Sequence, residues 1–227
     1  MPPTAAFLFS PPFCYFKQMK ARKKKYIIGI DEVGRGALAG PVVVAAVCLP
    51  ANLRISQKKL GTLKDSKKLS PKMRKLWTEY FKSVKKISYK VAGVHPRAIE
   101  RINISQAANR AASRASDRLI DSLGLPPDNF KIFLDGGLFI KNGEEYGAKT
   151  VIKGDEKITA VKAASIIAKV RRDKYMEKLS RKHPAYGFEV HKGYGTRAHM
   201  NAIRKYGPSE VHRLTFLRFS RKLQDKS

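Results

Sequence analysis

The chain has 227 residues and a formal net charge of +29, from 47 Lys and Arg against 18 Asp and Glu. With 43% hydrophobic residues it is neither intrinsically disordered nor collagen-like, and its length predicts one domain with a substantial core. The charge excess favours a polyanionic partner, most often nucleic acid, but indicates no particular reaction.

Two cysteines, Cys14 and Cys48, are too few for a disulfide framework in a chain of this length, and we expect a reducing, cytoplasmic location. The longest apolar run, residues 42–50, is far shorter than the roughly 20 residues that a bilayer span needs, so no membrane association is expected. Residues 1–24 contain four prolines followed by a basic run, and they predict a disordered tail. The domain is expected to span residues 25–221, with a short tail at 222–227.

Residues 26–31 (YIIGID) predict a buried strand, and residues 42–49 predict a second one. The segment between them is rich in glycine, so the two strands are expected to form a hairpin. Residues 65–69 (DSKKL) read as a polar loop. Ser70 then fits an N-cap with Pro71 at the first helical position, which predicts a helix to about residue 84.

The remaining chain alternates further strands with helices. Strands are predicted at residues 86–94, 131–135 and 150–153. Helices are predicted at residues 98–123, 157–182 and 197–206, with a loop rich in Gly, Tyr and His over residues 183–196. This order predicts an α/β or α+β fold around a mixed sheet.

The scarce acidic residues gather at the ends of predicted strands. Asp31 and Glu32 end the first strand, Asp135 ends a later one, and Asp155 precedes the long helix. Like charges that converge at a sheet edge are costly unless a cation holds them, and oxygen ligands suit Mg²⁺ or Mn²⁺. In a basic protein this pattern favours metal-dependent phosphodiester chemistry.

Each of these acids also has a structural explanation. Asp31, Glu32 and Asp135 stand beside glycines, where turns form, and Asp155 could cap the long helix. The metal-site interpretation therefore depends on the four side chains converging in space.

Two loops carry residues suited to nucleic acid. Gly34, Arg35 and Gly36 follow the acidic pair, and such a backbone can approach a 2′-hydroxyl, the group that separates RNA from DNA. The loop at residues 183–196 could stack a sugar or base and hold phosphates. A simple hairpin connection and a packed connector are the respective alternatives. The long helix has a cationic face that is either solvated or follows a phosphate backbone: Lys169, Arg171, Arg172, Lys174 and Lys178.

Several motifs follow one another between residues 26 and 216: GIDEVGRGALAGP, KDSKKLS, FLDG, IKGDEK, AASIIAKVRRD and HKGYGT, then GP…HR…F. In wording and order they closely resemble bacterial ribonuclease HII, a type 2 ribonuclease H. The resemblance implies a ribonuclease H-like fold, with a mixed five-stranded sheet flanked by helices and a C-terminal helical region. It implies a monomeric endonuclease that uses Mg²⁺ or Mn²⁺. Its implied substrates are RNA–DNA hybrids and duplex DNA with embedded ribonucleotides, incised on the 5′ side to leave 3′-OH and 5′-phosphate.

The resemblance also implies roles for individual residues. The metal-binding carboxylates would be Asp31, Glu32, Asp135 and Asp155. The 2′-hydroxyl would be sensed by Gly34, Arg35 and Gly36, and the next sugar would stack on Tyr194. The phosphate contacts would be Lys67, Lys68 and Lys192.

Two positions depart from the family pattern. Ser105 replaces a leucine-like residue and Arg171 a threonine, and both are expected to be scaffold or surface changes. The related ribonuclease HIII has an extra N-terminal domain and a Glu as its fourth acid, so Asp155 and the short segment before the first strand favour ribonuclease HII. From another functional class, a non-catalytic basic nucleic-acid-binding protein remains the alternative, and only the enzyme needs the four acids.

Overall fold

The computed structural model describes residues 25–53, 55, 57 and 60–217. The tails predicted at 1–24 and 222–227 lie outside the described residues. A five-stranded mixed sheet with strand order β3-β2-β1-β4-β5 forms the centre of the molecule. Its strands are β1 (Tyr26–Val33), β2 (Val42–Pro50), β3 (Ser88–Val94), β4 (Phe130–Asp135) and β5 (Lys149–Val151). The chain thus has the predicted α/β fold, a mixed five-stranded sheet flanked by helices.

The first three strands are antiparallel neighbours, which confirms the predicted hairpin between β1 and β2. By contrast, β4 runs parallel to β1, and their register pairs Ile30 with Leu134. The residues that follow this pair are Asp31 and Asp135. Two of the four acids predicted to bind metal therefore emerge next to each other at one edge of the sheet.

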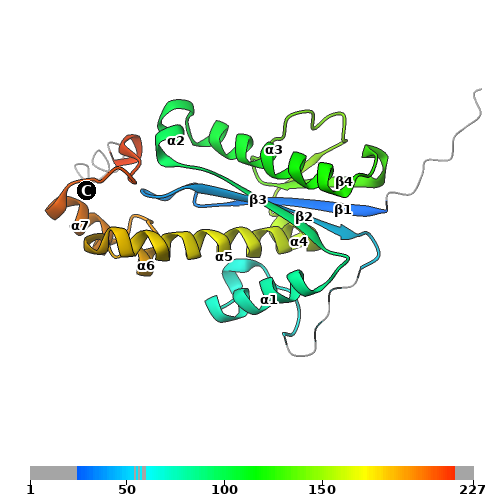
Figure 1. The fold of residues 1–227 in the computed structure, drawn as a ribbon, viewed down its shortest axis with the longest axis horizontal. Helices are drawn as coiled ribbons and strands as arrows, with labels where there is room; N and C mark the ends of the chain where they lie inside the picture. Colours follow the sequence, from blue (N-terminus) through cyan, green and yellow to red (C-terminus); the bar gives the residue numbers. More distant parts are fainter. Residues whose placement is uncertain (1–24, 54, 56, 58–59, 218–227) are drawn as a thin grey trace, which may run out of the picture.

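Helices cover both faces of the sheet (Figure 1). One face carries α2 (Pro96–Ile102) and α3 (Ile104–Leu123), and the other carries α5 (Thr159–Lys182) with α1 (Pro71–Ser83) beneath it. Ile28 and Ile30 belong to the core cluster that includes the buried alanines of α3. Gly29 faces α5, and a Cβ there would collide with the backbone of Ala160. The missing side chain brings α5 close to β1, which places the start of α5 beside the sheet edge.

The helix α1 begins as predicted: the Ser70 hydroxyl accepts a hydrogen bond from the N–H of Met73, and Pro71 occupies the first turn. The helix predicted over residues 98–123 is instead two helices. Asn103 separates them because its φ of 62° breaks the helical path, while its side chain caps α3 by accepting from Gln106.

The long basic helix is also interrupted near its start. A short helix, α4 (Gly154–Lys157), precedes α5, and Ile158 between them is extended. Asp155 therefore lies inside α4 and does not cap α5, so the interpretation of Asp155 as the N-cap of the long helix is wrong. The loop predicted at residues 65–69 contains a 3₁₀ turn, η1 (Ser66–Lys68).

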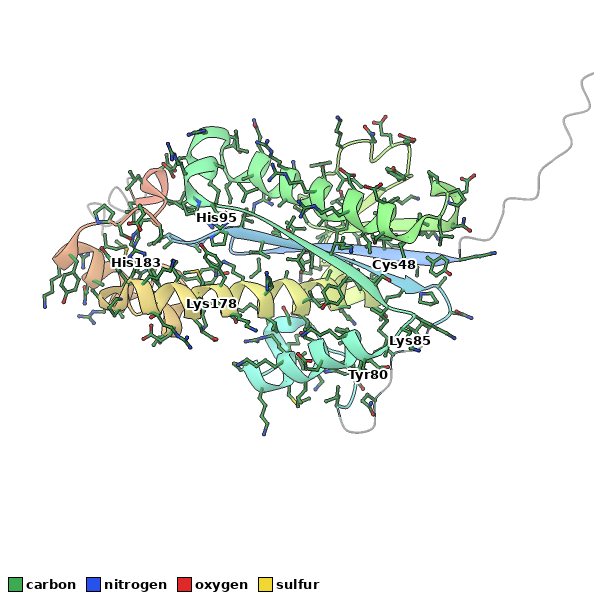
Figure 2. The ribbon with its side chains drawn as sticks, in the orientation of Figure 1. Cys48, Tyr80, Lys85, His95, Lys178 and His183 are labelled. Carbon is green, nitrogen blue, oxygen red and sulfur yellow. The ribbon has the colours of Figure 1, made fainter. Side chains whose placement is uncertain are left out.

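The C-terminal helical region gathers at the far end of α5 (Figure 1). It comprises η3 (Pro184–Tyr186), α6 (Phe188–His191) and α7 (Arg197–Tyr206), so the loop predicted at residues 183–196 carries two short helical turns of its own. Cys48 lies inside the sheet, where burial raises the pKa of its free thiol to about 12 (Figure 2). Among the described residues, no helix has the length and apolar character needed to cross a bilayer.

Candidate active site

Asp31, Asp135 and Asp155 converge where β1 and β4 end and α4 begins. Each offers a carboxylate oxygen, and these oxygens lie within 4.8 Å of one another. Asp31 and Asp155 are buried and Asp135 is half-buried. The fourth predicted acid, Glu32, follows Asp31 on β1 and is also half-buried. Tertiary structure thus brings Asp31 to within contact distance of two acids that follow it by more than a hundred residues.

Backbone groups orient two of these carboxylates. Oδ1 of Asp135 accepts hydrogen bonds from the N–H groups of Gly154 (2.6 Å) and Asp155 (3.4 Å) at the start of α4. Oδ1 of Asp31 accepts from the N–H of Glu32 at 2.7 Å. Because Asp135 holds the first turn of α4, it also fixes the position of Asp155.

Burial raises the pKa of three of the four carboxyls. For Asp31 the pKa rises well above its ordinary value, through desolvation and then through the charge of Glu32. Desolvation also raises the pKa of Glu32 and of Asp135, and for Asp135 the charge of Asp155 adds to it. The site therefore destabilises its own negative charge, as expected where carboxylates gather without a cation.

The chemistry of these donors fits a hard divalent cation. All four groups are carboxylates, the ligand type that Mg²⁺ and Mn²⁺ prefer. Oε2 of Glu32 is buried and has no hydrogen-bond partner among the residues that the structure describes. A buried acceptor without a partner is costly, and a cation at this position would satisfy it.

Lys67 contacts one of the four acids. Its Nζ lies 3.1 Å from Oδ2 of Asp155, and this hydrogen bond raises the pKa of Lys67. The Lys67 side chain is 79% exposed, whereas that of Asp155 is 5% exposed. Lys68, the other candidate of this turn, is exposed and forms no ion pair within the described part of the chain. Of these two lysines, Lys67 thus reaches the acids and Lys68 does not.

Residues 34–41, here called the GRG loop, follow directly after the acids. Gly34 has a φ of 87°, and a Cβ there would collide with the guanidinium of Arg172, so the fold itself requires this glycine. Gly36 is exposed, and a Cβ there would have no heavy atom within 4 Å. The fold does not require the second glycine, and the space beside it is open to a ligand.

The side chain of Arg35 links the acids to α3. Its Nη1 lies 3.3 Å from Oε1 of Glu32, and its Nη2 donates to Oγ of Ser105 at 2.9 Å. Ser105 is exposed, as expected for a surface change, and its hydroxyl in addition contacts the GRG loop. Arg171, the other departure, is exposed, as expected for a surface change.

Residues 191–196, here called the Tyr194 loop, pack against the GRG loop. The carbonyl of Gly193 accepts hydrogen bonds from the N–H groups of Leu38 (2.8 Å) and Ala39 (3.2 Å). The ring of Tyr194 has the Arg172 guanidinium 5.2 Å from its centroid and Lys169 Nζ 5.9 Å away. Tyr194 thus sits beside the GRG loop.

Lys192 lies in this second loop but away from the acids. Its Nζ binds Oε1 of Glu177 at 2.9 Å and the carbonyl of Glu189 at 2.8 Å. The structure therefore does not bring Lys192 to the carboxylates.

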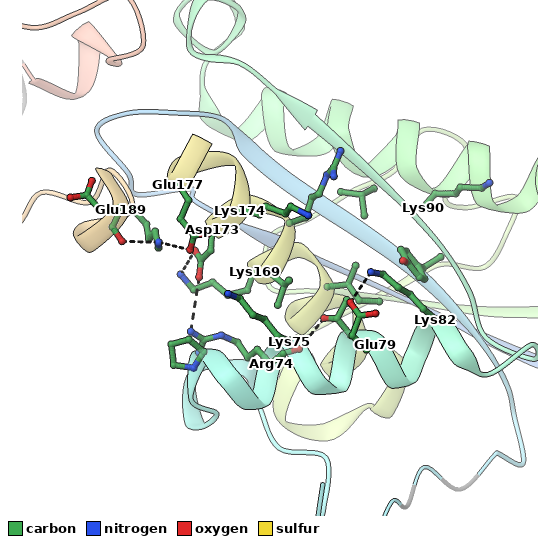
Figure 3. A pocket seen from close by; sticks show the side chains of 18 of the residues that line it. Arg74, Lys75, Glu79, Lys82, Lys90, Lys169, Asp173, Lys174, Glu177 and Glu189 are labelled. Carbon is green, nitrogen blue, oxygen red and sulfur yellow. Dashed lines mark hydrogen bonds and ion pairs between the residues drawn. The ribbon is translucent and has the colours of Figure 1, made fainter. Parts of the chain in front are cut away.

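A groove of about 1000 Å³ runs between α1, β3 and α5, and Lys192 and Lys169 line it (Figure 3). Asp173 in this groove pairs with Lys169 at 2.8 Å and with Arg74 at 4.0 Å. Four lining cations form no ion pair with any described residue: Lys75, Lys90, Arg171 and Lys174. The groove therefore presents excess positive charge next to Tyr194.

One member of the predicted cationic face behaves differently. The Arg172 side chain is fully buried and, among the described residues, donates only to backbone carbonyls, so its assignment to a solvated face is wrong. Spacing along the helix contains a signal for this, since Ala168 and Met176, four residues to either side, are fully buried as well. Arg213, also fully buried behind the GRG loop, carries no comparable signal in the sequence.

Residues 28–220 match the profile of the family described as Ribonuclease HII. Ribonuclease HII of Caldicellulosiruptor bescii is 44% identical over 195 residues, which are 86% of this chain and 87% of that protein. The chain belongs to the ribonuclease HII family. It is a ribonuclease H endonuclease that acts on RNA-containing nucleic acid and depends on a divalent metal. The alternative of a non-catalytic nucleic-acid binder is therefore set aside.

Solved structures share the fold of this ribonuclease HII. The ribonuclease HII in a complex with PCNA from Archaeoglobus fulgidus superposes with a TM-score of 0.61 at 29% identity, covering 83% of this chain and 93% of that one. Bst-RNase HIII, solved in complex with Mn²⁺, superposes with a TM-score of 0.59 at 24% identity, covering 81% of this chain and 63% of that one. At this identity the second likeness concerns the fold alone.

Proposed function

We propose that this ribonuclease HII cleaves the RNA strand of RNA–DNA hybrids and incises duplex DNA on the 5′ side of single embedded ribonucleotides, leaving 3′-OH and 5′-phosphate ends. One observation carries the proposal: the three aspartate oxygens lie within 4.8 Å of one another, and Glu32, next to Asp31, contacts Arg35 of the GRG loop. A metal-binding cluster and a glycine backbone that can approach a ribose thus form one continuous surface.

The four carboxylates are proposed to hold Mg²⁺ or Mn²⁺. A divalent cation bound there would supply an activated water and stabilise the leaving 3′-oxygen. Asp135 keeps its orientation through the α4 backbone, and Glu32 has a free buried oxygen to offer. Lys67 pairs with Asp155 in this structure. Because the Lys67 side chain is mostly exposed, it can turn to a substrate phosphate once a divalent cation binds Asp155.

We assign recognition of the ribose to Gly34, Arg35 and Gly36. The open space beside Gly36 lets a 2′-hydroxyl approach the backbone, while Arg35 is held by Glu32 and Ser105. Tyr194 is proposed to stack on the following sugar, and the two cations near its ring favour the adjoining phosphate.

The groove cations are proposed to bind the phosphate backbone of the duplex beyond the active site. Lys75 and Lys174 are free to do so, because neither forms an ion pair with a described residue. Lys68 is exposed near the acids and suits the same role. Lys192 would first have to release Glu177. We further propose that residues 25–221 act as a monomer in the cytoplasm, a location that suits the free thiol of Cys48.

A duplex carrying one ribonucleotide tests the proposal. The purified protein is incubated with this substrate and Mg²⁺, Mn²⁺ or EDTA, next to an all-DNA duplex of the same sequence. We expect metal-dependent incision 5′ to the ribonucleotide and none on the all-DNA duplex. Binding without incision in either metal would refute the proposal.

A further inference from the structure

Two buried arginines lie behind the GRG loop. The side chains of Arg172 and Arg213 are fully buried, and neither forms an ion pair with a carboxylate among the described residues. Burial lowers the pKa of both guanidiniums, that of Arg213 to about 9. Burying a cation without a counter-charge is costly, so other groups must compensate for it.

Backbone carbonyls of the GRG loop provide that compensation for Arg213. Its Nη2 donates to the carbonyls of Gly34 and Gly40, both at 2.8 Å. Its Nη1 donates to the carbonyl of Arg35 at 2.9 Å, and its Nε donates to that of Gly40 at 3.1 Å. Within the described part of the chain, every hydrogen bond of this guanidinium therefore ends on the GRG loop.

Arg172 joins the GRG loop to the Tyr194 loop. Its Nε donates to the carbonyl of Pro41 at 2.9 Å and its Nη2 to that of Ala39 at 3.1 Å. Its Nη1 donates to the carbonyl of Lys192 at 2.9 Å, at the base of the Tyr194 loop. One guanidinium thus connects the two loops proposed to contact the ribose and the next sugar.

These contacts determine which backbone groups remain available to a ligand. The carbonyls of Gly34 and Arg35 are engaged by Arg213 inside the protein. The N–H groups of Arg35 and Gly36 have no hydrogen-bond partner among the residues described. The arginines therefore set the conformation of the GRG loop without occupying its outer face.

We infer that Arg172 and Arg213 are positioning residues for substrate discrimination: by holding six loop carbonyls, they lock the GRG and Tyr194 loops into one preformed surface that reads the ribose. This inference rests on the proposed function. A purely structural cation would affect all substrates alike. A positioning residue affects most the substrate whose recognition depends on a single 2′-hydroxyl.

The test replaces Arg213 by Lys, which keeps the positive charge but cannot reach three carbonyls at once. Arg118→Lys is the matched control, because Arg118 is exposed on α3 and far along the chain from both loops. Incision of a duplex with one ribonucleotide is compared with cleavage of a continuous RNA–DNA hybrid under single-turnover conditions. We expect Arg213→Lys to lose about tenfold or more on the single ribonucleotide, a smaller factor on the hybrid, and no change in the metal concentration for half-maximal rate.

A second pair of measurements applies if Arg213→Lys folds poorly. Free guanidinium chloride at millimolar concentration is expected to restore single-ribonucleotide incision to Arg213→Ala and to leave Arg118→Ala unchanged.

Equal losses of Arg213→Lys on both substrates, or wild-type rates on both, would overturn the inference. Amide hydrogen exchange tests the loop lock without relying on cleavage, so a failure of the inference can be told from a failure of the proposed function. If the wild type incises neither substrate, the proposed function fails, and the loop lock is decided by exchange alone. Faster exchange at residues 34–41 and 191–196 in Arg213→Lys than in the wild type supports the lock, and unchanged exchange refutes it.

Discussion

His199 and His212 share a hydrogen bond between their Nε2 atoms, 3.1 Å apart, beneath the Tyr194 loop. The other hydrogen bonds of the two rings settle which Nε2 atom donates its proton in this shared bond. Nδ1 of His199 pairs with the carbonyl of Tyr194, so it must be the donor there, and Nδ1 of His212 accepts from the N–H of Ser209. His212 therefore donates to His199, and both rings are neutral. This chain of bonds ties the base of the Tyr194 loop to the C-terminal region.

The histidine pair predicts a loss of stability in mild acid. Burial lowers the pKa of both His199 and His212 from 6.5 to about 4, with the neighbouring histidines adding to the effect. The unfolded chain thus binds more protons between these two values, and the free energy of unfolding falls as the pH drops from 6.5 to about 4. Across this range the free energy of unfolding is expected to fall by on the order of 3 kcal/mol for the first ring that protonates.

Denaturant unfolding followed across this pH range measures the effect. His199→Gln is expected to flatten the pH dependence, whereas His95→Gln, at an exposed position, retains it. A pH dependence of His199→Gln identical to that of the wild type would contradict the neutral, buried pair.

Asp135→Asn is expected to abolish cleavage and to leave hybrid binding largely intact. The amide oxygen can still accept from Gly154, so α4 keeps its place, but the negative charge for the cation is lost. We expect the rate to fall by about 100-fold or more. Cleavage assays and fluorescence anisotropy with a labelled hybrid measure the two properties, with Asp117→Asn on the exposed side of α3 as the control. Full activity of Asp135→Asn would exclude Asp135 from the site.

Gly36→Ala tests whether the open space beside the GRG loop belongs to the substrate. The fold has room for the methyl group, so the thermal midpoint should change by less than about 2 °C. A bound ribose would meet that methyl group, and we expect about tenfold slower incision at a single ribonucleotide. Wild-type incision by this variant would show that the substrate does not approach Gly36.

Ser105→Ala removes the hydroxyl that holds Nη2 of Arg35. Arg35 keeps its contact with Glu32, so we expect a partial effect, roughly three- to tenfold slower single-ribonucleotide incision with an unchanged metal requirement. Ser122→Ala is the control, because that hydroxyl bonds only to a carbonyl of its own helix. Identical rates for wild type, Ser105→Ala and Ser122→Ala would remove Ser105 from the recognition surface.

Lys174→Gln tests the groove as a track for the phosphate backbone. The slope of log affinity against log salt should become shallower by about 0.9 if Lys174 contacts one phosphate. Lys131→Gln should leave the slope unchanged, because Lys131 is exposed at the opposite end of β4 from Asp135. Equal salt slopes for Lys174→Gln and Lys131→Gln would show that the duplex does not follow this groove.

Local patterns in the sequence were sufficient for most of the secondary structure. Apolar runs marked β1 and β2, and the Ser70–Pro71 pair marked the start of α1 correctly, because strand burial and helix capping depend on a few neighbouring residues. The break at Asn103 was missed, since a helix interruption at φ 62° leaves the apolar spacing on both sides intact.

The sequence by itself determined the family, the candidate acids and the candidate ribose-reading loop, because these are carried by short motifs whose order survives without coordinates. Only the tertiary structure decided that Asp31, Asp135 and Asp155 meet, that Ser105 holds Arg35, and that Arg172 and Arg213 support the GRG loop from inside. These contacts join residues 20 to 179 positions apart. The two arginines bond to backbone carbonyls, and no side-chain pattern along the chain encodes such partners.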